Sequence, residues 1–95
     1  MNKDLLIENR LVFEKLRQLS NRNKFRIIEL TQKDEMAITL IAKEIKLAYN
    51  KCSDYCTKLQ RVGLIDKKKR GKEVLIKSKI GMESLSDALK IKSQR

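Results

Sequence analysis

The stretch TLIAKEIKLAYNKCSDYCTKLQRVG, residues 39–63, decides the fold of this chain. Its apolar residues recur at helical spacing and predict two short helices, about 39–46 and 50–62, joined by a tight turn. The first helix and its turn are expected to bury Leu40, Ile41, Ile45 and Leu47. The second helix is expected to bury the stripe Cys52, Tyr55, Cys56, Leu59 and Val62.

The opposite face of the second predicted helix is polar and basic. It carries Lys51, Ser53, Asp54, Thr57, Lys58 and Arg61. Lysine donates to guanine acceptors, and serine and threonine bond to bases or phosphates, so this face suits a DNA major groove. A carboxylate there accepts from a cytosine amine or pairs with a neighbouring lysine. For Asp54 we favour the pair, with Lys51 or Lys58, over contact with cytosine.

Two further helices are predicted before this stretch. Apolar spacing indicates one at about 4–19 and another at about 21–32, with Ser20 or Asn21 as the cap of the second. Its expected core residues are Phe25, Ile28 and Leu30. The short apolar segment 36–38 then predicts a small strand, and Thr39 is expected to cap the next helix.

A β-hairpin is predicted after the stretch, over about 64–77. Gly63 is expected to end the preceding helix in the left-handed conformation. A two-residue mirror-image turn would place Arg70 at positive φ, so we favour a slightly longer loop with Gly71 left-handed. A last helix, about 81–92, would start from Ser78 or Ser84.

Composition bounds the class of protein. The 95 residues suit one domain, and 41% hydrophobic with 37% charged residues indicates a folded chain. Histidine is absent, which excludes nucleophile–His catalysis and His-ligated metal sites, and we expect no enzymatic function and no cofactor. No apolar run reaches the roughly 18 residues of a membrane span. The first ten residues, MNKDLLIENR, are too acidic for a signal peptide, so a cytoplasmic protein is expected.

The positive charge is concentrated in one part of the chain. The net charge is +11, which points to a polyanion, either nucleic acid or an anionic membrane surface. Residues 43–79 hold twelve Lys/Arg against four Asp/Glu, whereas residues 1–42 hold eight against six. The excess therefore lies on the outer helix and the hairpin, as nucleic-acid binding requires.

This order of elements resembles the winged helix-turn-helix regulators, most closely the ArsR-like branch and its small archaeal relatives. The likeness is carried by LSNRNKFRIIEL (19–30), IAKEIKLAYNKCSDYCTKLQRVGLI (41–65), KKKRGKEVLI (67–76) and SKIGMESL (78–85). Within these segments Ala42, Leu47, Leu59, Gly63 and Leu64 match the pattern of the unit. The resemblance covers about residues 19–85 and implies a mainly α fold with a small β-hairpin. We expect residues 1–95 to form one such domain. It also implies a homodimer that pairs through the helices at 4–19 and 81–92.

The sequence departs from the pattern of these regulators at the turn. Lys46 stands where glycine is usual, and a left-handed lysine costs roughly 1 kcal/mol relative to glycine. Ala48 replaces the usual Ser/Thr cap, so Asn50 is expected to cap the second helix, which would divert it from reading bases. The cysteine pair of the metal-sensing members is absent from the 39–47 helix, so metal sensing is not carried over.

Cys52 and Cys56 lie four residues apart and suggest a redox switch, half a metal site or simple packing. Helical neighbours at this spacing have Cβ atoms about 5–6 Å apart, whereas a disulfide needs about 3.5–4.5 Å. Two thiolates without further ligands make a poor zinc site. We therefore favour packing as small hydrophobes.

The hairpin tip is expected to grip DNA phosphates or probe the minor groove. Its cations are Lys67, Lys68, Lys69, Arg70 and Lys72, and strand alternation puts them on both faces of the hairpin, which makes an interior role implausible. Lys43, Lys46 and Tyr49 are expected to contact the flanking backbone, and Tyr55 to lie in the core with its hydroxyl at the rim.

The sequence therefore predicts a regulator that binds double-stranded DNA at specific sequences and represses by occluding a promoter, with no identifiable small-molecule effector. Two alternatives stay open. One is an architectural or nucleoid protein that coats DNA with little specificity, and the other is a winged-helix module for protein contacts.

Overall fold

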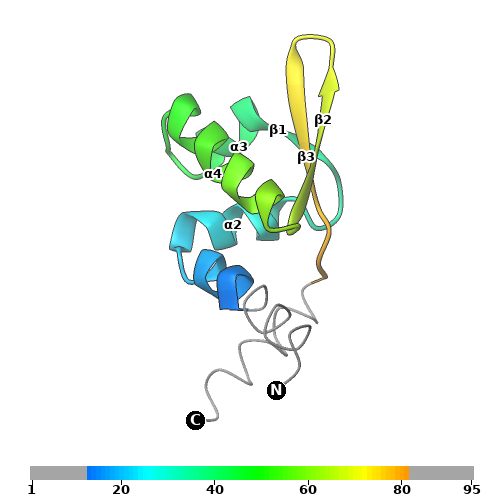
Figure 1. Ribbon diagram of the computed structural model, residues 1–95. Coiled ribbons are helices and arrows are strands. Elements are labelled where there is room, and N and C mark those ends of the chain that lie inside the picture. Colours follow the sequence, from blue (N-terminus) through cyan, green and yellow to red (C-terminus); the bar gives the residue numbers. More distant parts are fainter. Residues whose placement is uncertain (1–12, 82–95) are drawn as a thin grey trace, which may run out of the picture.

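The computed structural model describes residues 13–81, and their elements follow the predicted order. Residues 13–19 are helical. The other elements are α2 (Arg22–Leu30), β1 (Met36–Ala37), α3 (Ile38–Glu44), α4 (Tyr49–Arg61), β2 (Ile65–Arg70) and β3 (Glu73–Ser78). The predicted winged helix-turn-helix architecture is confirmed (Figure 1). The start of the predicted first helix and the predicted last helix, with Ser84, lie outside the described residues.

The three strands form one antiparallel sheet in the order β1-β3-β2. Lys68 pairs with Leu75 between β2 and β3, and Met36 pairs with Ile76 between β1 and β3. Figure 1 shows the β2–β3 hairpin projecting beyond the helices, with α4 beside its base. The hairpin therefore has the position of a wing, and we use that name for residues 65–78.

The core lies where the helices meet the sheet. Its fully buried side chains include Ile27, Ile28, Ile38, Ile41, Cys52, Cys56, Leu59, Leu64, Ile65 and Ile76. The prediction that Leu40 is buried is wrong, because 51% of it is exposed. The first turn of α3 points Ile38, Ile41 and Ala42 at the core, and Leu40 falls between them on the outer side.

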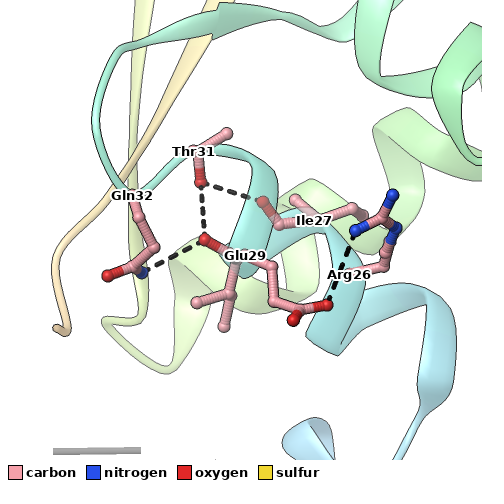
Figure 2. A network of polar contacts seen from close by, with 6 residues as sticks. Arg26, Ile27, Glu29, Thr31 and Gln32 are labelled. Atoms are coloured by element: carbon pink, nitrogen blue, oxygen red, sulfur yellow. Dashed lines mark hydrogen bonds and ion pairs between the residues drawn. The ribbon is translucent and has the colours of Figure 1, made fainter. Parts of the chain in front are cut away.

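The end of α2 is tied to the base of the wing. Thr31 Oγ1 donates to the Ile27 carbonyl at 2.9 Å, and Gln32 Nε2 donates to the Ile28 carbonyl at 3.1 Å (Figure 2). Gln32 Nε2 also lies 2.7 Å from Ser78 Oγ. Ser78 is the last residue of β3, so it does not start the last helix. These bonds fix where the wing leaves the helical body.

The predicted helix caps are correct for α2 and wrong for α3 and α4. Asn21 Oδ1 accepts from the Lys24 backbone N–H at 3.0 Å, which settles the choice between Ser20 and Asn21. Helix α3 begins after Ala37 and α4 after Ala48, with no side-chain cap at either end. Thr39 and Asn50 lie one residue inside the helices, because both helices start earlier than the apolar pattern indicated. Asn50 is exposed and its side chain is not used as a cap.

Helices α3 and α4 end in the same way. Lys46 has φ 56° and Gly63 has φ 79°, so each helix is followed by a left-handed residue, as predicted. The next backbone N–H reaches back to close the helix, from Leu47 to Ala42 at 2.9 Å and from Leu64 to Leu59 at 3.0 Å. This is the Schellman arrangement, built on lysine in one case and glycine in the other.

Replacing Lys46 by glycine is expected to raise the free energy of unfolding by up to about 1 kcal/mol, because the strain of a Cβ at positive φ is removed. Lys46→Ala is the matched control, since it removes the charged side chain and keeps the strain. Urea denaturation of both variants measures the difference. Equal stability of the glycine and alanine variants would contradict the strained turn.

The tip of the wing is a two-residue turn at Gly71 and Lys72, because Arg70 pairs directly with Glu73. The predicted longer loop is therefore wrong. Gly71, at φ 63°, is the first central residue of the turn, and Arg70 stays in the strand. A glycine at this position is what a type II′ turn requires, so no lysine or arginine of the tip is strained.

Candidate nucleic-acid interface

The surface of α4 divides into a central stripe and two flanks. The central stripe is exposed to solvent and consists of Asn50, Asp54 and Arg61. Asp54 Oδ2 lies 3.2 Å from Lys58 Nζ, one helical turn on, and this confirms the favoured lysine pair. Both side chains are about half exposed, so the pair contributes little stability and leaves each partner accessible.

The flank of α4 that faces the wing carries Ser53 and Thr57. Thr57 Oγ1 donates to the Ser53 carbonyl at 3.1 Å and accepts from Lys67 Nζ at 3.2 Å. All three side chains are half-buried. Lys67 therefore faces inward and braces the wing against α4, which corrects its expected place among the freely exposed cations of the tip. The Thr57 hydroxyl is likewise occupied within the protein.

This brace between the wing and α4 is expected to contribute a coupling energy of about 0.5–1.5 kcal/mol, the usual range for a partly buried hydrogen bond. A double-mutant cycle with Thr57→Val and Lys67→Met, followed by urea denaturation, isolates it from the effects of each substitution alone. Additive effects of the two substitutions would show that the contact contributes nothing.

The other flank of α4 faces α2. Lys51 Nζ and Lys24 Nζ each lie 5.3 Å from the centre of the Tyr55 ring. Such cation–π contacts fix the ring, which is half-buried. Tyr55 therefore lies at the core boundary, as predicted, and Lys51 is partly engaged on it while remaining exposed.

The tip of the wing presents the freest positive charge. Lys68, Lys69, Arg70 and Lys72 are all exposed. Arg70 Nη2 lies 3.5 Å from Glu35 Oε1, so one cation of the tip is paired with the loop before β1. Within residues 13–81, the three lysines make no ion pair.

The turn between α3 and α4 adds exposed groups beside the central stripe. Lys43, Lys46 and Tyr49 are exposed, as a backbone contact would require. Leu40, on the outer side of α3, is exposed too.

Arg22 and Arg26 were not predicted as site residues. With Asn23 they line a hollow of about 310 Å³ that reaches Ile45, next to this turn. Residues 1–42 have a nearly balanced charge, so the charge distribution did not indicate these two arginines as site residues. Their spacing of four residues, on the side of α2 opposite Ile27 and Ile28, was the pattern that could have revealed them.

Cys52 and Cys56 are free thiols with no exposed surface. The hydrogen bond to Cys52 and burial together raise the pKa of the Cys56 thiol, so it stays protonated near neutral pH. Within residues 13–81, no three Cys, Asp or Glu side chains are grouped as a metal ion would need. The burial of both thiols agrees with packing rather than with a reactive pair.

Native protein is therefore expected to resist alkylation by iodoacetamide at pH 7.5, while urea-unfolded protein takes up two adducts. Burial keeps the reagent from both thiols. The hydrogen bond between them raises the pKa of Cys56, which keeps its reactive thiolate scarce, and lowers the pKa of Cys52, so burial alone protects Cys52. Intact-mass spectrometry counts the adducts and also shows whether reduction changes the native mass. Rapid native labelling, or a mass shift on reduction, would contradict the packing role.

No protein-family model and no curated protein sequence matches this chain. Solved structures do. NolR from Sinorhizobium fredii matches at a TM-score of 0.78 and 19% identity, over 96% of this chain and 93% of that one. A second match is a fragment of Mb0332 from Mycobacterium bovis, described as the homodimeric winged helix-turn-helix DNA-binding domain of a possible ArsR-family transcriptional regulator. It has a TM-score of 0.79 and 16% identity, over 97% of this chain and 84% of that one.

The transcriptional regulator HlyU from Vibrio vulnificus is also similar, with a TM-score of 0.70 and 18% identity, over 97% of this chain and 95% of that chain. At such identities the likeness establishes the fold. The predicted resemblance to the ArsR-like winged helix-turn-helix proteins is thus confirmed in structure, while the likeness to small archaeal relatives stays a prediction. Within residues 13–81, no helix is long and apolar enough to cross a membrane.

Proposed function

We propose that this protein is a transcription regulator that binds double-stranded DNA at specific sequences. The observation that carries the proposal is the exposed central stripe of α4, whose Asn50, Asp54 and Arg61 side chains have no role in the core. An amide, a carboxylate and a guanidinium are the groups that read adenine, cytosine and guanine edges. A helix with this outer face fits a major groove.

The remaining cations would hold the helix in register. Lys68, Lys69 and Lys72, exposed at the wing tip, would bind phosphates or the minor groove on one side of α4. Lys43, Lys46 and Tyr49 would contact the backbone at the start of α4. The hydrogen bond from Lys67 to Thr57 would hold the wing at a fixed distance from α4. The wing could then contact the phosphates or the minor groove while α4 lies in the major groove.

The wing and helix of one chain cover a single half-site, so the proposal includes a homodimer over 1–95 that pairs through its terminal helices. The related Mb0332 domain is homodimeric. A dimer would place two α4 helices about one DNA turn apart, on a palindromic operator. Light scattering at micromolar concentration tests this, and a mass of one chain would refute the dimer.

Repression by occlusion of a promoter needs no catalytic group, cofactor or effector, and the protein would act in the cytoplasm on the nucleoid. An architectural protein of low specificity is the second candidate. It is favoured by the ion pair with Lys58, which partly occupies the Asp54 carboxylate that would otherwise read a base, and by the wing lysines, which make no ion pair within residues 13–81.

Competition binding separates these functions. A labelled promoter fragment is bound at 0.15 M salt and challenged with excess random DNA. A regulator retains the fragment, and an architectural protein is displaced in proportion to the competitor. Absence of all DNA binding at this salt would refute both functions and favour a module for protein contacts.

A further inference from the structure

A basic hollow of about 240 Å³ lies at the junction of the helix at 13–19, α2 and the end of α4. Its lining residues are Glu14, Arg17, Gln18, Lys24, Lys58, Arg61 and Val62. Four of these seven side chains are cations and one is an acid. The cations come from three separate helices, so the cluster is formed only by the fold.

The neutralisation of these cations is weak. Arg17 pairs with Glu14 at 3.6 Å, but both side chains are largely exposed, and Lys58 pairs with Asp54 on the helix surface. Exposed pairs of this kind are worth about 0–1 kcal/mol each and exchange readily with other partners. Arg61 makes no ion pair within the part of the chain that the structure describes.

Lys24 is the unusual member of the cluster, because only 9% of it is exposed. Its ammonium donates to the neutral Gln18 amide oxygen and lies over the Tyr55 ring, and in the described residues no carboxylate pairs with it. Burial and the nearby Lys58 lower the pKa of Lys24, while Asp54 acts in the opposite direction. A buried ammonium without a paired anion is destabilising, and a bound anion would relieve it.

We propose that this hollow is a binding site for a small oxyanion of the phosphate or carboxylate class. The guanidinium groups of Arg17 and Arg61 would each donate two hydrogen bonds to oxygens of one anion. The buried Lys24 ammonium would add positive charge at the inner wall of the hollow. The volume suits an anion of a few heavy atoms. Because Lys58 and Arg61 also lie on the proposed DNA-facing side of α4, an anion held here would lower DNA affinity. This coupling rests on the proposed function, whereas anion binding itself does not.

The test uses the full chain without DNA. Inorganic phosphate is titrated at constant ionic strength, balanced with chloride, and amide chemical shifts are followed by NMR. Saturable shifts are expected at 13–19, at the start of α2 and at the end of α4. The variant Arg17→Gln/Arg61→Gln is expected to raise the dissociation constant for phosphate at least tenfold. Lys33→Gln, an exposed cation near the other end of α2, is the matched control and should leave it unchanged.

Citrate in place of phosphate shows whether the site prefers carboxylates or phosphates. Lys24→Met, which keeps the buried stem and removes the charge, provides a second variant with the same expected weakening. Shifts that do not saturate, that chloride reproduces, or that Lys33→Gln reduces as much as the arginine pair would overturn the site. Saturable phosphate binding in a protein that never binds DNA would support the site and contradict the proposed function.

Discussion

Replacing Lys68, Lys69 and Lys72 by glutamine is expected to weaken binding to every DNA sequence and to flatten its salt dependence. These lysines are exposed at the wing tip and make no ion pair within the described residues 13–81. Each phosphate contact contributes about 0.9 to the slope of log affinity against log salt, so loss of three contacts would reduce the slope by roughly 2.7. Fluorescence anisotropy over 50–300 mM salt, with operator and random duplexes, measures both quantities.

The control for the wing compares Lys68→Gln with Lys33→Gln, which remove the same charge from the wing and from the loop after α2. Only the wing variant should change the slope. Because the exposed lysines make no contact in the core, both variants are expected to unfold at the wild-type urea concentration. An unchanged slope in the triple variant would sink the assignment of the wing to phosphates.

Asn50→Ala is expected to relax sequence preference at one base position while leaving binding to random DNA nearly unchanged. The Asn50 amide is exposed in the first turn of α4, where recognition helices contact base edges, and it is free because it does not cap the helix. A bidentate amide–adenine contact is worth about 1–3 kcal/mol of discrimination, which is roughly five- to 150-fold in affinity between the preferred base and its competitors.

The comparison for Asn50 is Gln60→Ala, which removes an exposed amide near the far end of the same helix. It should keep the preference of the wild type at every position. Affinities for an operator and its single-base variants provide the measurement. Equal loss of affinity for operator and random DNA on Asn50→Ala would place this side chain on the backbone rather than on a base.

The inner faces of the elements were the predictable part of the fold. The spacing of Cys52, Cys56 and Leu59 defined the buried side of α4, and Gly63 marked its end. Lys46 is left-handed as expected, because the next backbone N–H must reach Ala42 whatever residue occupies the turn. Local periodicity and turn chemistry were sufficient at these positions.

Helix starts and the hairpin turn were not predictable in the same way. Thr39 and Asn50 are good capping residues, yet the alanines before them take the cap positions. Packing of Ile38 into the core and pairing of β1 with β3 fix where α3 begins, and tertiary contacts of this kind override a capping preference. The same early start of α3 leaves Leu40 outside.

The exposed cations of the candidate site were predictable from the sequence, but the side-chain contacts that some of them make within the protein were not. The chain order gives no indication that Lys67 reaches Thr57, ten residues away, or that Lys24 sits under Tyr55. These contacts depend on how α2, α4 and the wing pack. They also divide the predicted residues into those engaged within the protein, such as Lys67 and Thr57, and those left exposed for the proposed DNA contact, among them Asn50 and the wing lysines.

The proposed regulator reads DNA sequence with the outer face of α4. In vitro selection from a random duplex library, at 0.15 M salt, tests this role of α4 most directly. We expect enrichment of one motif, palindromic if the protein is a dimer, and loss of part of that motif when Asn50 and Arg61 are replaced by alanine. Recovery of no motif, or of the same motif with the α4 variant, would contradict this role.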